Sequence, residues 1–107
     1  MPRLYIKIIK MILEKQIKQK LTEVLDPELG ISIVDLGLIY KIEIKDNNVK
    51  VVMTLTTVAC PLGPMIQDEV KEKVKQLGVK KVKVELVFDP PWNFDMLTKK
   101  GKKSLGI

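Results

Sequence analysis

Residues 40–55 read YKIEIKDNNVKVVMTL and contain the clearest structural signal in the chain. Apolar and charged residues alternate over residues 40–45, which is typical of a strand with one buried face. A second alternation covers residues 49–55. The intervening residues 46–48, Asp-Asn-Asn, favour a tight turn because Asp and Asn tolerate the left-handed backbone region. The stretch therefore predicts a β-hairpin.

Helical periodicity flanks this hairpin on both sides. Apolar residues recur every three or four positions over residues 9–24, and we expect Asp26-Pro27 to end that helix because a residue before proline avoids the α region. After the hairpin, Pro61 is well placed to open a second helix, and Gly78 suits its C-terminal end. The apolar stripe of this second helix comprises Leu62, Ile66, Val70, Val74 and Leu77.

A third strand and a short helix complete the predicted order. Residues 82–88 alternate again and are followed by Asp89-Pro90-Pro91. We expect Asn93 to cap a last helix running toward Leu105, which Gly101 weakens. The order α-β-β-α-β-α predicts an α/β fold, specifically a two-layer α+β sandwich with a three-stranded mixed sheet and helices on one face.

Composition limits the classes of protein to consider. The chain has 107 residues, 46% hydrophobic and 30% charged, which fits one folded domain and excludes disorder. The net charge is +6, yet Arg3 is the only arginine and aromatic residues make up 5%. Specific nucleic-acid contacts rely on arginine and aromatic side chains. A solvated lysine surface is therefore favoured, and a module for nucleic acid or another anionic surface is the weaker alternative.

The amino-acid composition also indicates the cellular compartment of the protein and the boundaries of its domain. No apolar run approaches the roughly 20 residues that span a bilayer, so we expect no membrane contact. A single cysteine fits a reducing compartment, and we expect a cytoplasmic protein. Residues 1–10 are interpreted as an N-terminal extension, with Met11 as an alternative initiator, and residues 11–107 as one domain.

Cys60 is the main candidate for chemistry. It stands between the second predicted strand and the second helix, where free backbone N–H groups stabilise a thiolate and lower the pKa of the thiol. With one cysteine and no histidine, a single chain has no disulfide, zinc finger or Cys-His nucleophile pair. Coordination shared between chains and thiol or persulfide relay remain. The structural alternative is a small buried hydrophobe.

Carboxylates and hydroxyls are candidates to join this thiol. Asp26, Glu28 and Asp35 lie in predicted loops, although an Asp before proline more often caps its own turn. Thr56 and Thr57 are hydrogen-bonding candidates, although strand-end threonines are more often β-branched filling residues.

Four ordered motifs resemble those of a known family. They are DPELG at residues 26–30, VDLGLIY at 34–40, TLTT at 54–57 with CPL at 60–62, and FDPPW at 88–92. Together they resemble the metal–sulfur cluster assembly family, which includes SufT-like and PaaD-like proteins and the eukaryotic cytosolic iron–sulfur targeting factors. The resemblance covers residues 12–107, nearly the whole chain.

The resemblance implies a fold like the C-terminal domain of NifU scaffolds and a non-enzymatic role in delivering clusters to apo-proteins. Its implied partners are iron–sulfur scaffold or carrier proteins and apo-client proteins. An accessory subunit of one enzyme complex, as in the PaaD-like members, is the alternative. The implied functional thiol is Cys60, with Trp92 nearby as a lid or packing element; the other implied site residues are Asp26, Glu28, Leu29, Thr56 and Thr57.

Ligand number limits how a cluster is held. Iron–sulfur clusters normally take four thiolates, and one chain offers only Cys60. We therefore expect any cluster to be transient and shared between chains, for example in a homodimer. Carboxylates from Asp26 and Glu28 are poor substitutes for thiolates, so such a cluster would be labile. The alternative is an adaptor that binds no cluster and bridges a carrier to its client.

Overall fold

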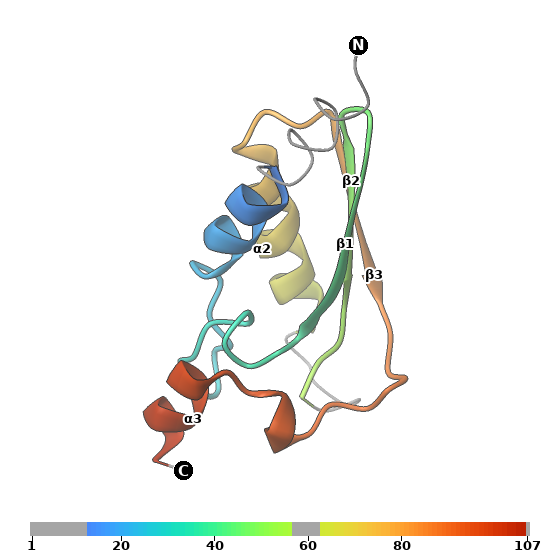
Figure 1. Cartoon of the computed structure of the whole chain (residues 1–107). Helices are drawn as coiled ribbons and strands as arrows, with labels where there is room; N and C mark the ends of the chain where they lie inside the picture. Colours follow the sequence, from blue (N-terminus) through green and yellow to red (C-terminus); the bar gives the residue numbers. More distant parts are fainter. Residues whose placement is uncertain (1–12, 57–62, 107) are drawn as a thin grey trace.

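The structure is a computed structural model that describes residues 13–56 and 63–106. The helix of residues 13–21 and α2 cover one face of a three-stranded sheet, and no other described element covers the opposite face (Figure 1). This is the predicted two-layer arrangement. The labelled elements are β1 (Ile39–Lys45), β2 (Asn48–Met53), α2 (Gly63–Lys75), β3 (Lys81–Leu86), the 3₁₀ helix η1 (Phe94–Met96) and α3 (Lys99–Leu105).

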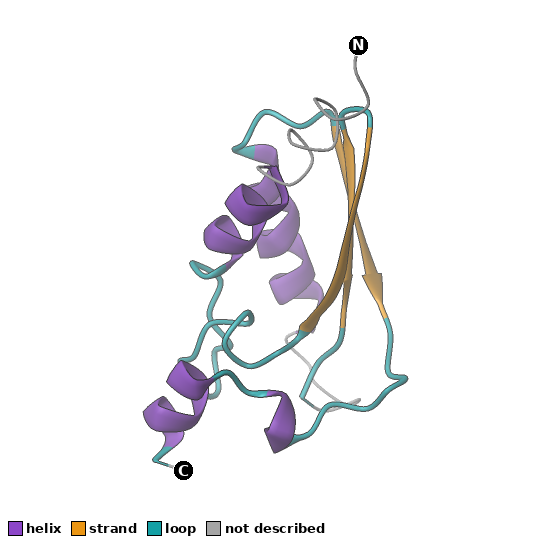
Figure 2. Cartoon of the chain, in the orientation of Figure 1, coloured by secondary structure: helices purple, strands orange, loops and turns teal. Residues whose placement is uncertain are grey.

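The sheet has the order β1-β2-β3 and is mixed (Figure 2). β1 and β2 form the predicted antiparallel hairpin, in which Asp46 takes the left-handed conformation at φ 55°. β2 and β3 pair in parallel, with Val51 opposite Val84. Because β2 and β3 run in the same direction, their carboxyl ends lie at one end of the sheet.

The core lies between the sheet and the helices. Val51 and Met53 of β2 are fully buried, whereas the alternate residues of that strand face outward and are at least partly exposed. The buried residues of α2 are Gly63, Ile66, Val70 and Val74, which confirms the predicted stripe within the described part of that helix. Gly78 follows α2 at φ +86°, as its predicted C-terminal role requires.

The first helix ends earlier than predicted. It stops at Leu21 and not at Asp26-Pro27. Residues 24–33 instead fold back on themselves: the Ile33 N–H donates to the carbonyl of Val24 at 3.0 Å, and the Asp26 N–H to that of Ile31 at 2.9 Å. These bonds take the backbone groups that would have continued the helix, so proline is not what ends it.

The prediction for the last helix was wrong in its cap. Asn93 caps η1, where its side chain accepts from the Asp95 N–H at 2.9 Å. α3 begins at Lys99 and is capped by Thr98, whose hydroxyl accepts from the Gly101 N–H at 3.1 Å. Gly101 also allows α3 to approach the backbone of Asp35 closely. A Cβ at that position would stand 2.5 Å from the backbone oxygen of Asp35.

Gly37 has the strictest requirement for glycine. Its φ is +75°, and a Cβ there would overlap the backbone carbonyl of Met96. Gly30 also has a positive φ, +68°, but nothing lies within 4 Å of where its Cβ would be. The two positions therefore separate the cost of backbone strain from the cost of a steric clash.

We predict that Gly37→Ala lowers the free energy of unfolding by about 2–4 kcal/mol, because strain and a backbone clash act together. Gly30→Ala, the matched control, is expected to cost about 1–2 kcal/mol from backbone strain alone. Urea denaturation of both variants measures the difference. Equal losses would contradict the close approach of residue 37 to η1.

Candidate functional site

The described parts of three motifs, VDLGLIY, TLTT and FDPPW, lie at one end of the sheet, where β2 and β3 finish and β1 begins (Figure 1). The DPELG loop borders the second of the four motifs, VDLGLIY, through a shared hollow. Backbone hydrogen bonds connect the segments there. The Thr54 N–H donates to the carbonyl of Leu38 at 2.9 Å, and the Val87 N–H to that of Met53 at 2.8 Å. Segments distant in sequence thus share one surface. Thr57 and Cys60 lie outside the described residues.

Asp26 organises its own loop. It is 4% exposed, and its Oδ1 accepts from the N–H of Glu28 at 2.8 Å and from that of Leu29 at 3.1 Å. The Gly30 N–H donates to the Asp26 carbonyl at 2.7 Å. This is the turn-capping role that the sequence left open for Asp26. Glu28 and Leu29, by contrast, are exposed to solvent.

A hollow of about 390 Å³ lies beside this loop. Leu29, Asp35 and Lys100 are among its lining residues, whereas Asp26 and Glu28 do not line it. The Asp35 carboxylate accepts a hydrogen bond from the Thr98 hydroxyl at 2.9 Å. Of the predicted site residues in this loop, only Leu29 therefore borders the hollow.

Trp92 connects the FDPPW motif (residues 88–92) to the VDLGLIY motif (residues 34–40). Its indole Nε1–H donates to the carbonyl of Leu36 at 2.6 Å, and its ring meets Phe94 edge-on at a centroid distance of 5.1 Å. The Tyr40 hydroxyl donates to the Pro90 carbonyl at 2.7 Å, after the cis Asp89-Pro90 peptide. These contacts favour the packing role for Trp92 over a movable lid.

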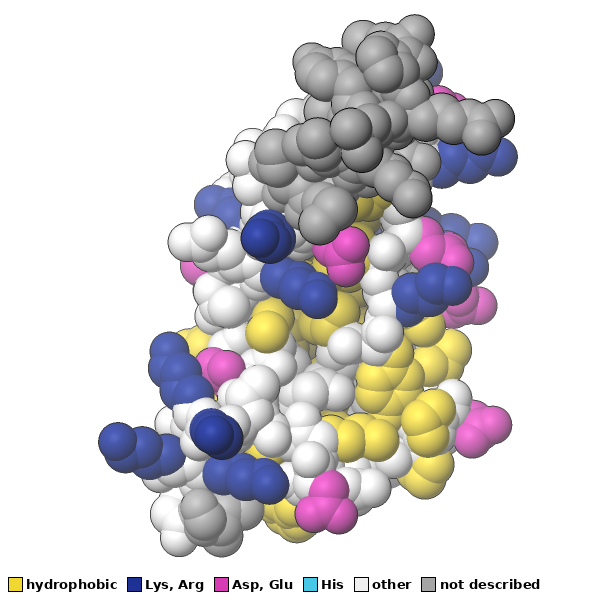
Figure 3. Space-filling view, in the orientation of Figure 1, with side chains coloured by type: hydrophobic (Ala, Val, Ile, Leu, Met, Phe, Trp, Pro, Cys, Tyr) yellow, Lys and Arg dark blue, Asp and Glu magenta, His cyan; other side chains and the backbone are white. Residues whose placement is uncertain are grey.

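Apolar side chains remain exposed around this segment. Phe88 is 37% exposed and Phe94 59% exposed. In Figure 3 apolar side chains gather over the lower right of the molecule, below the sheet. Exposed aromatic residues of this kind mark a surface suited to transient protein contact.

Thr54 is a site candidate that the sequence did not single out. It is fully buried, and its hydroxyl oxygen has no hydrogen-bond partner among the described residues. Thr56, two positions later, is half-buried. A buried hydroxyl without a partner is costly. Only its burial in the structure identifies Thr54 as a candidate, because the TLTT motif alone does not distinguish it from the other threonines.

Metal-binding groups are sparse in the described part of the chain. Over residues 13–56 and 63–106, no three His, Cys, Asp or Glu side chains are grouped closely enough to hold a metal ion. Asp26 and Asp35 are already engaged in hydrogen bonds with their own surroundings. These residues do not fit a resident metal centre. None of the helices described has the length and apolar composition to span a membrane.

Comparison with known proteins agrees with the motifs. A family model described as iron–sulfur cluster assembly protein matches residues 14–86. This chain belongs to that family. The resemblance carried by the four motifs is thereby confirmed, and so is the α+β fold that it implied.

Similar proteins cover most of this chain and most of their own length. A Bacillus subtilis protein named Fe-S protein maturation auxiliary factor YitW is 43% identical over 97 residues, covering 89% of this chain and 95% of the relative. A Staphylococcus aureus protein named Fe-S protein maturation auxiliary factor SufT is 45% identical over 86 residues, covering 78% and 98%. Both names describe auxiliary factors.

The fold has a close counterpart among solved structures. The crystal structure of a domain of unknown function, DUF59, from Bacillus anthracis superposes with a TM-score of 0.86 at 34% identity. The superposition covers 91% of this chain and 94% of that one. The family assignment thus rests on sequence and on structure.

We predict that Thr54→Val preserves the free energy of unfolding or raises it by about 1 kcal/mol, because it removes a buried hydroxyl without changing the shape. Thr98→Val is the matched control. It removes the α3 cap and the bond to Asp35, and it should cost about 0.5–2 kcal/mol. Urea denaturation compares the two. A loss at Thr54 as large as that at Thr98 would mean that a partner outside the described residues holds this hydroxyl.

Proposed function

We propose that this member of the iron–sulfur cluster assembly family helps to mature iron–sulfur proteins by delivering clusters to apo-proteins, with Cys60 as its functional thiol. One observation carries the proposal. The described parts of three family motifs lie together at the end of the sheet where the chain enters and leaves the segment that contains Cys60, and the fourth, DPELG, borders one of them across a hollow. The similar YitW and SufT proteins are named as maturation factors, which supports the same role.

Both ends of the Cys60 segment are anchored at this end of the molecule. Leu55 is 4% exposed, and its Cδ1 stands 3.0 Å from where a Cβ of Gly63 would be. Cys60 comes five positions after Leu55 and three before Gly63, the first residue of α2. A thiol held near a helix N-terminus is more easily ionised, and a thiolate is a soft ligand for iron.

The role is non-enzymatic and its chemistry is ligand exchange. The thiolate of Cys60 holds iron of a passing cluster and is then replaced by a thiolate of the recipient, so no electrons change hands. In this proposal the Asp26 turn, which leaves Glu28 and Leu29 exposed, contributes those two residues to the site, and Thr56 and Thr57 contribute hydroxyl donors. Trp92 holds the last motif against Leu36 of the second.

A cluster must be shared because one chain carries one thiol. Two copies of this chain, or one copy with a carrier or client, supply the missing ligands. The exposed Phe88 and Phe94 offer such a partner an apolar surface beside the motifs. A reducing cytoplasm would keep Cys60 available as a thiol.

Alkylation measures the activation of Cys60. We predict that its reaction rate with iodoacetamide rises with pH along a curve whose midpoint lies below the usual cysteine value of about 8.5, because the helix N-terminus stabilises the thiolate. The unfolded protein in urea is the control. A folded-state midpoint at or above the unfolded one would remove the argument from the helix terminus.

Cluster delivery is tested by anaerobic reconstitution with iron and sulfide, followed by transfer to apo-aconitase. We predict a coloured species larger than a monomer in the wild type. Cys60→Ser should lose at least about 90% of the transfer rate, while its unfolding free energy changes by less than about 1 kcal/mol. Val70→Ala is the converse control, because Val70 is fully buried. It should cost about 1–3 kcal/mol and retain transfer below its melting temperature.

Two results would contradict parts of this scheme. A cluster on a species of monomer mass, without added thiol, would show that the ligand count is wrong. Protein that stays colourless at every concentration, yet accelerates transfer from a loaded carrier, would identify an adaptor and not a carrier.

A further inference from the structure

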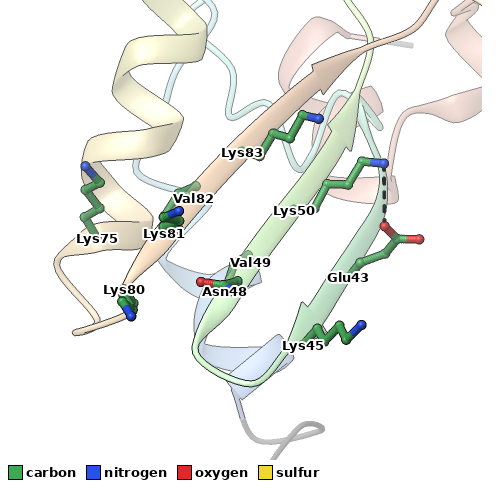
Figure 4. A pocket seen from close by; sticks show the side chains of 10 residues that line it. All are labelled: Glu43, Lys45, Asn48, Val49, Lys50, Lys75, Lys80, Lys81, Val82 and Lys83. Carbon is green, nitrogen blue, oxygen red and sulfur yellow. Dashed lines mark ion pairs between the residues drawn. The ribbon is translucent and has the colours of Figure 1, made fainter.

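The face of the sheet that no described helix covers carries a hollow at the end opposite the candidate site. It has a volume of about 500 Å³ and lies over the hairpin turn and the beginning of β3 (Figure 4). Among the described residues that line it, Glu43 is the only acidic one. Its basic lining residues are Lys45, Lys50, Lys75, Lys80, Lys81 and Lys83.

The strand register places these lysines against one another. Lys50 of β2 stands directly opposite Lys83 of β3, and Asn48 lies between Lys45 on β1 and Lys81 on β3. Figure 4 shows these side chains standing on the same face of the sheet. Like charges in directly opposed positions destabilise a sheet. Stability of the sheet therefore does not account for this arrangement.

The neighbouring acids neutralise only one of the lysines. Lys50 pairs with Glu85 at 3.0 Å and with Glu43 at 3.8 Å, and these partners, Glu85 foremost, raise the pKa of Lys50. Glu43 is also shared with Lys41 at 3.0 Å. Within the described residues, no ion pair involves the other lysines of the hollow, which are Lys45, Lys75, Lys80, Lys81 and Lys83.

The remaining segments of the chain offer no carboxylate side chain in compensation. Residues 1–12 and 57–62 contain neither Asp nor Glu. The positive charge at this end is therefore available to a partner, and each lysine adds a point charge at the end of a long side chain.

The chemistry of the hollow favours carboxylates over nucleic acid. Its described lining residues include no arginine to bind phosphate with two parallel hydrogen bonds and no aromatic side chain to stack on a base. Lys81 and Lys83 stand two residues apart on β3, roughly 6.6 Å, which matches the spacing of alternate acidic side chains on an extended peptide.

We propose that this lysine hollow binds an acidic segment of a partner protein, rich in Asp and Glu. The surface lies on a different face and at a different end from the candidate site, so the inference does not depend on Cys60 or on cluster binding. It provides a docking contact that leaves the motif end of the molecule free.

The test uses a fluorescein-labelled oligoglutamate peptide and fluorescence anisotropy at low salt. The test variant combines Lys45→Gln, Lys81→Gln and Lys83→Gln. The control combines Lys15→Gln, Lys71→Gln and Lys103→Gln, which are exposed lysines elsewhere with the same total charge. We expect the test variant to weaken binding about fivefold or more and the control less than about twofold, since only the first removes local contacts.

Three outcomes would overturn the proposal. One is an equal loss in both triple variants, which would show only long-range attraction to a basic protein. The others are tighter binding of single-stranded DNA, or of vesicles containing phosphatidylserine, with the same dependence on the three lysines. If the triple variant does not fold, Lys81→Gln alone replaces it, with Lys71→Gln as its control, and the same comparison applies.

Discussion

The backbone carbonyls of Asp35 and Leu36 accept hydrogen bonds from the C-terminal part of the chain, and the motif end of the molecule depends on this contact. The Thr98 N–H donates to Asp35 at 2.9 Å and the Trp92 indole to Leu36 at 2.6 Å. Gly37 and Gly101 let the two backbones approach to distances that a side chain would prevent. Without this junction, neither η1 nor α3 would be fixed against residues 35–37, because each helix is short and buries little surface of its own.

The parallel pairing of β2 with β3 divides the molecule into two ends with different properties. The carboxyl ends of these strands lead into the family motifs and an apolar, aromatic surface. The amino ends and the hairpin turn carry the lysine hollow. An assembly factor must contact both the protein that donates a cluster and the protein that receives it. Two separate surfaces allow it to bind both partners at the same time.

Two carboxylates of the family motifs, Asp26 and Asp35, have structural roles. Asp26 caps its own turn, and Asp35 receives the Thr98 hydroxyl that also caps α3. The chemistry proposed for this end therefore falls to Cys60 and to threonine hydroxyls, with a ligand set too small to store a cluster. A protein so equipped suits transfer better than storage, because a weakly held cluster is easily released.

Local sequence alone determined the elements of this protein. Period-two alternation defined the strands, the apolar stripe defined α2, and Asp46 and Gly78 marked positions of positive φ. The inventory of one cysteine and no histidine limited its chemistry before any fold was known.

Tertiary structure decided the rest. The first helix ends at Leu21 because residues 24–33 fold back on themselves. The contact of Thr98 with Asp35 and the need for glycine at position 101 arise from backbone groups distant in sequence. The lysines of the hollow come from both hairpin strands, from β3 and the residue before it, and from the end of α2, and only strand register and packing bring them around one hollow. Local propensity carries no information about such pairings, because their hydrogen bonds and close approaches form only once the chain has folded.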